Sequence, residues 1–394
     1  MQPTLIQNVR ALEPGHGGVG TALLIADQRI VAIDPSQPGE VERIDGGGRL
    51  LTPGLIDLHV HGIETCVFEA GPEPMRQGLG RLARYGTTTC LPTLYRVMDR
   101  GSLDRIGQRS QAIDGQPAAA GLHLEGPFLA LPGAGAATMS GDIGLLKELL
   151  AATGERVAAM SVSPDTPAII PVIEHLAERN IAVFLTHTRA SAEQTDRAIA
   201  AGARHATHFY DVFPVPAETE PGVRPVGAVE AILADPAVSV DFIPDGVHVH
   251  PAAIRAALAA KGWGGVIAIT DANIGAGLPD GVYDTAWGYP VRVGRGDAAR
   301  VHRPGSAENG TLAGSALTMD QAVRQLRKWL ADRLPDEQIW AMATANPARV
   351  LGLRDRGSLL PGAVADLVLW DETGDQLQAA RTWQRGQCVY THHA

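Results

Sequence analysis

Apolar runs alternate with amphipathic stretches from about residue 52 to residue 351. Each run has the length of a buried strand and is followed by a polar turn, then by a stretch typical of a helix. Eight such runs are present: 54–62, 87–94, 119–126, 157–164, 181–188, 205–211, 238–246 and 265–273. Helices are expected between them, for example over 145–152, 166–179, 192–201 and 251–261. This alternation predicts a (β/α)8 barrel, which carries its active site at the carboxyl ends of the strands.

The alternative to a barrel is an open, doubly wound sheet. Such sheets often bind dinucleotides through a G-x-G-x-x-G turn after the first strand. No such turn follows the run at 54–62, so the barrel is favoured.

The two ends of the chain have a different pattern, with short strands broken by turns and no helices between them. Strands are expected over 4–12, 20–34 and 42–51, and again over 365–372 and 383–391. Together they predict a small β-sandwich domain built from both termini. The predicted domains are therefore residues 1–52 and 352–394 for the β-sandwich and 53–351 for the barrel.

One long segment, 275–315, does not fit the alternation of strand and helix. It follows the eighth strand, and its residues 289–295 are typical of a hairpin. Long loops at this face of a barrel usually serve function.

Composition and charge exclude several classes of protein. The chain has 394 residues, with 33 basic and 43 acidic side chains and a net charge of -10, so it lacks the basic surface that nucleic-acid binding needs. Three cysteines are too few for a disulfide framework. No signal peptide is visible at the start, and no apolar run reaches the ~18 residues of a membrane span. We therefore expect a cytoplasmic protein that acts on a small molecule and binds neither nucleic acid nor membrane.

Histidines gather where the predicted strands end. Of 13 histidines, eight lie at or near these ends: His59, His61, His123, His187, His205, His208, His248 and His250. His59 and His61 are two residues apart on one strand, so both imidazoles point to the same side. Converging neutral imidazoles suggest a transition-metal site.

A buried carboxylate supports the same interpretation. Glu125 ends the third strand, and a carboxylate aimed into a barrel is costly unless it binds a cation or accepts hydrogen bonds. With His187 and His208 it supplies three ligands and leaves positions open, as catalytic metal sites require. Each histidine alone could equally be a buried structural residue.

Asp271 ends the eighth strand and is the candidate general acid and base. It could take a proton from an activated water and pass it to a leaving group. The structural alternative is that Asp271 caps a helix, a role for which aspartate is well suited.

The three lysines decide one question of metal chemistry. Lys147, Lys261 and Lys328 all lie in predicted helices, so none can serve as a carbamylated bridge at a strand end. Any bridging ligand must then be a carboxylate, and Glu125 is the candidate.

Several motifs carry a resemblance to a known family: PGLIDLHVHG, GLHLEGPF, FLTHT, HATHFYD, DGVHVHP, ITDA and NGTLAGSALTMDQAV. They resemble the amidohydrolase superfamily, and in particular its N-acetylglucosamine-6-phosphate deacetylases. The similarity runs from Pro53 to about Asp371.

The resemblance implies roles for individual residues. Glu125, His187 and His208 would hold the principal divalent ion, and His59 and His61, with Glu125 bridging, a second one. Asp271 would be the catalytic acid and base. The implied substrate-binding residues are Asp211, Val212, His248 and Leu312. The resemblance further implies one or two ions per subunit and a homodimer, with zinc preferred over iron, manganese or cobalt.

The chain departs from the family pattern where the substrate would bind. Ala137 stands where the family has a carbonyl-polarising histidine, and Asp211 replaces an amide that contacts phosphate. Thr219 replaces the arginine that the family offers across its dimer, and Arg224 lies five residues further on. These changes predict an N-deacetylase-like amide hydrolase whose N-acyl, amino-sugar-like substrate is not the standard 6-phosphate.

Two other hypotheses remain open at this point. The same metal site could serve a cyclic amidase, a deaminase or a lactonase. The chain could also be a non-catalytic, metal-containing barrel, although all five metal-ligand positions and Asp271 are retained.

Overall fold

Eight parallel strands form the centre of the molecule. The computed structural model describes residues 2–96, 98–133, 136–285, 288–294 and 297–392. The strands pair in the order β14-β13-β12-β11-β10-β9-β8-β5. A parallel bridge between Val60 and Ala272 joins the first strand to the segment after the last, so the barrel is nearly closed. The strands are β5 (Leu55–Val60), β8 (Thr87–Leu94), β9 (Leu122–Glu125), β10 (Val157–Val162), β11 (Ala182–Leu185), β12 (His205–Ala206), β13 (Ser239–Phe242) and β14 (Val266–Ala268).

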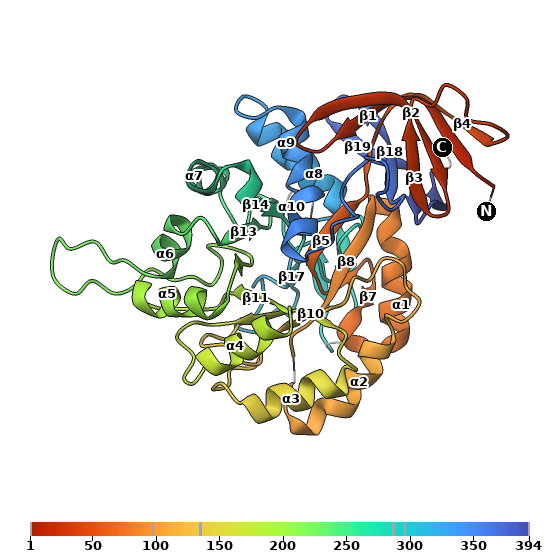
Figure 1. The fold of residues 1–394 in the computed structure, drawn as a ribbon. Helices are drawn as coiled ribbons and strands as arrows, with labels where there is room; N and C mark the ends of the chain where they lie inside the picture. The colour runs from red at the N-terminus through yellow and green to blue at the C-terminus, as the bar shows by residue number, and fades with distance from the viewer. Residues whose placement is uncertain (1, 97, 134–135, 286–287, 295–296, 393–394) are drawn as a thin grey trace.

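Helices surround these strands, as Figure 1 shows. Apolar side chains such as Leu146 and Leu149 of α3 and Ile173 of α4 are fully buried against the barrel. Helix α5 illustrates how local sequence sets the bounds, because Ser191 and Gln194 form a capping box at its start and Gly202 follows its end. The helices are α1 (Pro72–Arg81), α2 (Leu103–Gln111), α3 (Ile143–Ala152), α4 (Ile170–Glu178), α5 (Ala192–Ala201), α6 (Ala228–Ala234), α7 (Pro251–Lys261), α8 (Met319–Leu330), α9 (Asp336–Ala341) and α10 (Ala345–Val350).

The chain termini meet in a second sheet beside the barrel. Its seven strands pair in the order β20-β19-β18-β4-β1-β2-β3, and Figure 1 shows the red N-terminal strands next to the dark blue C-terminal ones. Trp383, Leu51 and Leu367 belong to its apolar core. The strands are β1 (Thr4–Glu13), β2 (Gly17–Ala26), β3 (Arg29–Ile33), β4 (Glu42–Pro53), β18 (Leu367–Thr373), β19 (Gln376–Gln384) and β20 (Gln387–Thr391). The predicted fold class is confirmed, whereas the boundaries at residues 52 and 351 stay a prediction.

The long segment after β14 folds over the barrel mouth as a small sheet. Strand β16 (Val291–Val293) lies in the predicted hairpin, but its partners β15 (Gly281–Tyr283) and β17 (Arg300–Val301) come from outside it. Arg295, the last residue of that hairpin, lies outside the described residues. The small sheet packs on Val67 of β7 (Cys66–Val67), which pairs with β6 (Gly62–Ile63). The segment is therefore a folded cover above the strand ends.

The described part of the chain contains no helix of the length and apolarity that crossing a membrane requires. Lys147, Lys261 and Lys328 lie in helices α3, α7 and α8, and none of them stands at the carboxyl end of a barrel strand. A lysine bridge at the strand ends is therefore excluded, as the sequence predicts.

Candidate metal centre

The carboxyl ends of five barrel strands bring the predicted chemistry together. His59 lies within β5 and His61 directly after it, while Glu125 ends β9. His187 and His208 each follow their strand by two residues, after β11 and β12, and Asp271 follows β14 by three. Five of these side chains are buried, and Asp271 is partly buried. Parallel strands of a barrel end at one face, which is why residues so distant in the chain meet here.

Glu125 lies at the centre of this cluster and uses its two oxygens on different sides. Its Oε1 atom is 3.0 Å from Nε2 of His187 and 3.1 Å from Nε2 of His208. Its Oε2 atom is 3.4 Å from Nε2 of both His59 and His61. One carboxylate thus faces two pairs of histidines, which is the arrangement that a bridging ligand would need.

Asp271 completes the side of the cluster that holds the first histidine pair. Its Oδ1 atom is 3.1 Å from Nε2 of His61 and 3.6 Å from Nε2 of His59. The backbone N–H of Asp271 donates to the carbonyl of His59 at 2.9 Å, which ties the end of the eighth strand to the first. It does not begin a helix, because the residues after it lead into the small sheet over the barrel mouth. The structural alternative of a helix cap is therefore excluded.

Three residues of the cluster adopt left-handed backbone conformations. The φ angles are 49° at His187, 34° at His208 and 47° at Asp271. Residues with side chains rarely take such values, and the strain concentrates at functional sites where the surrounding structure imposes it. Here the turns direct His187 and His208 toward Glu125, and Asp271 toward His61.

Two threonines contact the Nδ1 atoms of imidazole rings in the cluster. The Nδ1 atom of His59 lies 3.0 Å from Oγ1 of Thr207, and the Nδ1 atom of His61 lies 3.2 Å from the carbonyl of Thr93. Each contact leaves the Nε2 atom of its ring directed at the carboxylates. Partners of this kind fix the ring orientation and tautomer of histidine ligands.

We expect Thr207→Val to weaken metal binding by about 10–100-fold, because His59 would lose the hydroxyl that orients its ring. Titration with zinc against a competing chelator measures the effect. The matched control is Thr382→Val, since the Thr382 hydroxyl, in the terminal sheet, donates to the carbonyl of Ala83 and lies away from the cluster. Equal affinity in the two variants would show that the Thr207 contact has no part in metal binding.

The carboxylates and imidazoles of the cluster shift one another's pKa values in a way that favours their charged forms. Burial lowers the pKa of His61, but hydrogen bonds with Asp271 and Glu125 outweigh it and raise the pKa to about 10. Burial likewise lowers the pKa of His208, and Glu125 raises it to about 10. Burial raises the pKa of Glu125, yet the neighbouring histidines hold it well below its ordinary value. The carboxylates are therefore ionised, and a bound cation would displace the histidine protons.

This donor set fits a divalent transition metal. Within the described ranges, the two groups of ligand atoms close enough to share an ion both lie here: His59, His61 and Asp271, and His59, Glu125 and His208. The Nε2 atoms of His59 and His61 approach to 3.1 Å, a distance at which two ring nitrogens gain from a shared cation. Imidazole with carboxylate suits zinc, iron, manganese and cobalt.

A cavity of about 180 Å³ opens above the cluster. The expected substrate-binding residues Asp211, Val212, His248 and Leu312 all line it, together with His61, Glu125, His187, His208 and Asp271. His59 does not line it and is fully buried. The structure thus places all ten predicted site residues in one cluster, although their roles stay predictions.

Sequence reasoning missed four residues that line this cavity: Gly133, Gly314 and two with polar side chains, Tyr95 and Asn273. Tyr95 directly follows β8, and Asn273 lies two residues after Asp271. Their positions beside strand ends were the available signal. His123 was expected near the cluster by its spacing to Glu125, but it lies deeper, 2.7 Å from Oγ of Ser161.

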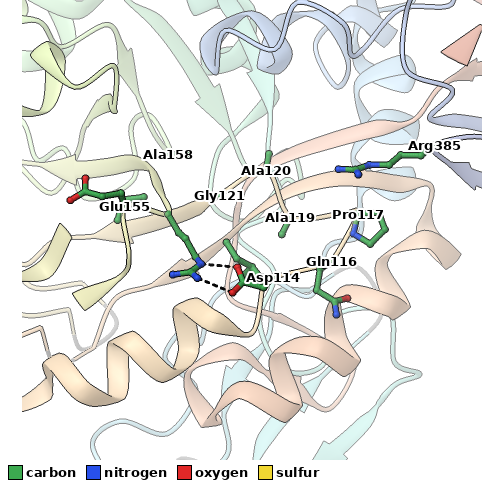
Figure 2. A pocket seen from close by; sticks show the side chains of 13 residues that line it. Asp114, Gln116, Pro117, Ala119, Ala120, Gly121, Glu155, Ala158 and Arg385 are labelled. Carbon is green, nitrogen blue, oxygen red and sulfur yellow. Dashed lines mark hydrogen bonds and ion pairs between the residues drawn. The ribbon is translucent and has the colours of Figure 1, made fainter. Parts of the chain in front are cut away.

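Larger cavities lie elsewhere and lack this chemistry. One of about 480 Å³ lies beside the start of β10, and Figure 2 shows Asp114 and Arg385 on its wall. Its charges are largely satisfied, because Arg156 donates two hydrogen bonds to Asp114 at 2.7 and 2.8 Å. The small cavity over Glu125 is the candidate active site.

Comparisons with known proteins agree with this geometry. The amidohydrolase family pattern matches residues 50–391. An N-acetylgalactosamine-6-phosphate deacetylase from Escherichia coli O157:H7 is 35% identical over 377 residues, covering 93% of each chain. An N-acetylglucosamine-6-phosphate deacetylase from Lysinibacillus sphaericus is 33% identical over 341 residues, covering 84% of each chain.

Solved structures show the same likeness over the whole chain. A mutant N-acetyl-D-glucosamine-6-phosphate deacetylase from Mycobacterium smegmatis, in complex with N-acetyl-D-glucosamine-6-phosphate, superposes with a TM-score of 0.85 at 28% identity, covering 99% of this chain and 100% of that one. These relatives do not favour a cyclic amidase, a deaminase, a lactonase or a non-catalytic barrel. They confirm the predicted enzyme class, a metal-dependent hydrolase of carbon–nitrogen bonds outside peptides that resembles these deacetylases. The chain belongs to the amidohydrolase family.

Proposed function

We propose that this enzyme removes the acyl group from an N-acyl amino sugar, or a similar N-acyl amine, that carries no 6-phosphate. The observation that carries the proposal is the placement of Glu125 between two histidine pairs, with Asp271 at the edge of a small cavity. Deacetylase relatives at 33–35% identity support the reaction type.

The metal centre would be divided between the two sides of Glu125. His187, His208 and Glu125 would hold the principal ion, and His59 and His61 would share Glu125 with a second. Zinc is the proposed metal, with iron, manganese and cobalt as alternatives. When bound, a divalent ion would lower the pKa of water and polarise the acyl carbonyl.

Asp271 would move the proton. The hydrogen bond with His61 helps to hold its pKa below the ordinary value against the effect of burial, so the carboxylate is ionised and can accept a proton. It would take this proton from the attacking water as the carbon–oxygen bond forms. It would then give the proton to the amine nitrogen as the carbon–nitrogen bond breaks.

The wall of the cavity argues against a phosphorylated substrate. Asp211 lines it, and among the described residues no lysine or arginine does. Arg224 is 81% exposed in its side chain and pairs with Glu230 at 2.8 Å, outside the cavity. His248 lines the cavity, but its Nδ1 atom is held by Asp245 at 2.6 Å. A phosphate would meet the Asp211 carboxylate, and among the described residues no lysine or arginine of this cavity would offset that charge.

Asp211→Asn should improve the use of phosphorylated substrates relative to unphosphorylated ones. Removing one negative charge near the phosphate would raise the kcat/KM ratio for N-acetylglucosamine-6-phosphate over N-acetylglucosamine by about tenfold, given the Coulomb energy of such a pair. Glu308→Gln is the control, because it removes one negative charge from an exposed ion pair with Arg303. An unchanged ratio in Asp211→Asn would remove the electrostatic basis for this substrate assignment.

The proposed function is tested by acetate release from a matched panel. Zinc-loaded protein would be assayed with N-acetylglucosamine, N-acetylgalactosamine and their 6-phosphates. Higher kcat/KM for the unphosphorylated sugars supports the proposal, and higher kcat/KM for a 6-phosphate contradicts its substrate. Ammonia release or ring opening without acetate, on cyclic amides or lactones, would contradict the reaction itself.

We also propose that the enzyme is a cytoplasmic homodimer. The support is the resemblance of its motifs to the deacetylases. Light scattering of the purified protein would test the dimer, and a monomer mass would contradict it.

A further inference from the structure

Tyr95 contributes a phenol to the cavity that the proposed reaction does not yet use. It directly follows β8, is 4% exposed, and lines the cavity beside Glu125 and Asp271. Over the described parts of the chain, the only hydrogen bond of Tyr95 comes from its backbone N–H. A hydroxyl that is nearly buried, faces a cavity and lacks a protein partner is available to a ligand.

The ring of Tyr95 is held on several sides. It packs against His61 with ring centroids 4.7 Å apart and planes at 70°, and it clusters with Leu129 and Ala136. Its backbone N–H donates to Oε1 of Glu69 at 2.8 Å. The guanidinium of Arg109 donates in turn to the carbonyl of Glu69 at 2.6 and 3.1 Å. The hydroxyl is therefore presented by a fixed ring, as preorganised catalysis requires.

The cavity places three carboxylates beside its imidazoles and the amide of Asn273. Glu125, Asp211 and Asp271 are carboxylates, and an ionised carboxylate cannot donate a hydrogen bond. The described residues that pack on the Tyr95 ring from the loop after β9, Leu129 and Ala136, are apolar. A tyrosine phenol keeps its proton at neutral pH and can donate a hydrogen bond. An acyl oxygen that gains negative charge in this cavity needs such a donor.

We propose that the Tyr95 hydroxyl donates a hydrogen bond to the carbonyl oxygen of the scissile acyl group and holds that oxygen as it becomes an oxyanion. This inference rests on the proposed function and adds a catalytic residue to it. The hydrogen bond forms to the reacting oxygen, and no proton is transferred. Removing one donor to an oxyanion costs about 10²–10³-fold in kcat.

Asn273 is the competing donor. It lines the same cavity and is 4% exposed, and its Oδ1 atom accepts from the backbone N–H of Ile274 at 2.9 Å. It follows Asp271 by two residues in the chain, and Tyr95 packs on His61, the histidine that contacts Asp271. The experiment must therefore separate these two residues.

The test compares Tyr95→Phe with the unchanged zinc enzyme on the best sugar of the panel. We expect kcat to fall by about 100-fold with KM nearly unchanged, since the bond strengthens mainly in the transition state.

Binding is measured separately with the methylphosphonamidate of the same amine, whose tetrahedral phosphorus bears an anionic oxygen. Its Kd should rise by a similar factor, while the Kd of the free amine product should not change. Tm should also stay the same, because the hydroxyl has no protein partner to lose. Tyr390→Phe in β20 is the control.

The outcomes are distinguishable. If Tyr95→Phe matches the unchanged enzyme in kcat and in analogue binding, the Tyr95 inference is wrong and the proposed function stands. A loss seen in Asn273→Ser but absent from Tyr95→Phe also overturns it and assigns the donor to Asn273. If the unchanged enzyme neither releases acetate nor binds the analogue, the proposed function and the inference both fail.

Discussion

Asp271→Asn is expected to lower kcat by about 10³-fold, within the range that positioned acid–base groups contribute. Asparagine keeps the shape of the side chain but cannot accept a proton from water or return it to the leaving amine. The ligands around Oε1 of Glu125 are untouched, so the variant should still bind at least one zinc ion. Steady-state acetate release and elemental analysis of the same preparation measure both quantities.

The control for this change is Asp114→Asn, which removes a carboxylate paired with Arg156 away from the cluster. It should retain both kcat and metal. If Asp271→Asn keeps most of its kcat, another group carries the proton and the assigned role of Asp271 is wrong. If it loses all metal, the main role of Asp271 is to bind the metal and not to transfer the proton.

Glu125→Gln should have the largest effect on the metal centre. The neutral amide cannot balance the charge of an ion, and the two histidine pairs would lose the carboxylate that lies between them. Substituting a residue that only orients a metal ligand typically lowers metal affinity by ~10–100-fold. We expect a larger loss of metal affinity here, with acetate release falling in proportion. Competition titration with zinc measures the affinity.

Glu155→Gln is the matched control, because Glu155 pairs with Arg179 at the surface. Circular dichroism would establish that both variants are folded. A folded Glu125→Gln protein with undiminished zinc content would contradict the bridging role of Glu125.

Much of the barrel could be predicted because local signals and tertiary structure agree there. Helix α7 begins at Pro251 and ends before Gly262, as the sequence predicts, since proline favours a first turn and glycine an end. The apolar runs of the barrel strands are buried on both faces, so they are easy to recognise. The cluster followed from the same pattern, because its residues end these runs.

Predictions failed where distant partners decide the structure. The single strand expected over 20–34 is instead two strands, β2 and β3, which pair antiparallel with each other. In the small sheet over the barrel mouth, β16 pairs with β15 and β17, whereas the sequence suggests a hairpin within 289–295.

Tyr95 escaped prediction for a related reason. An aromatic residue that follows an apolar strand is usually core, and only the packing of Leu129 and Ala136 against it shows which side of the ring is left open. Ala137 alone could tell that a polar side chain is missing from that loop.

The most direct test of the account is the position of bound zinc in crystals of the zinc-loaded enzyme, located by anomalous scattering. The account predicts one ion held by His187, His208 and Glu125, and a second, at higher zinc concentration, held by His59, His61 and the other oxygen of Glu125. Zinc bound elsewhere, with Glu125 and its histidines left as ion pairs, would contradict it.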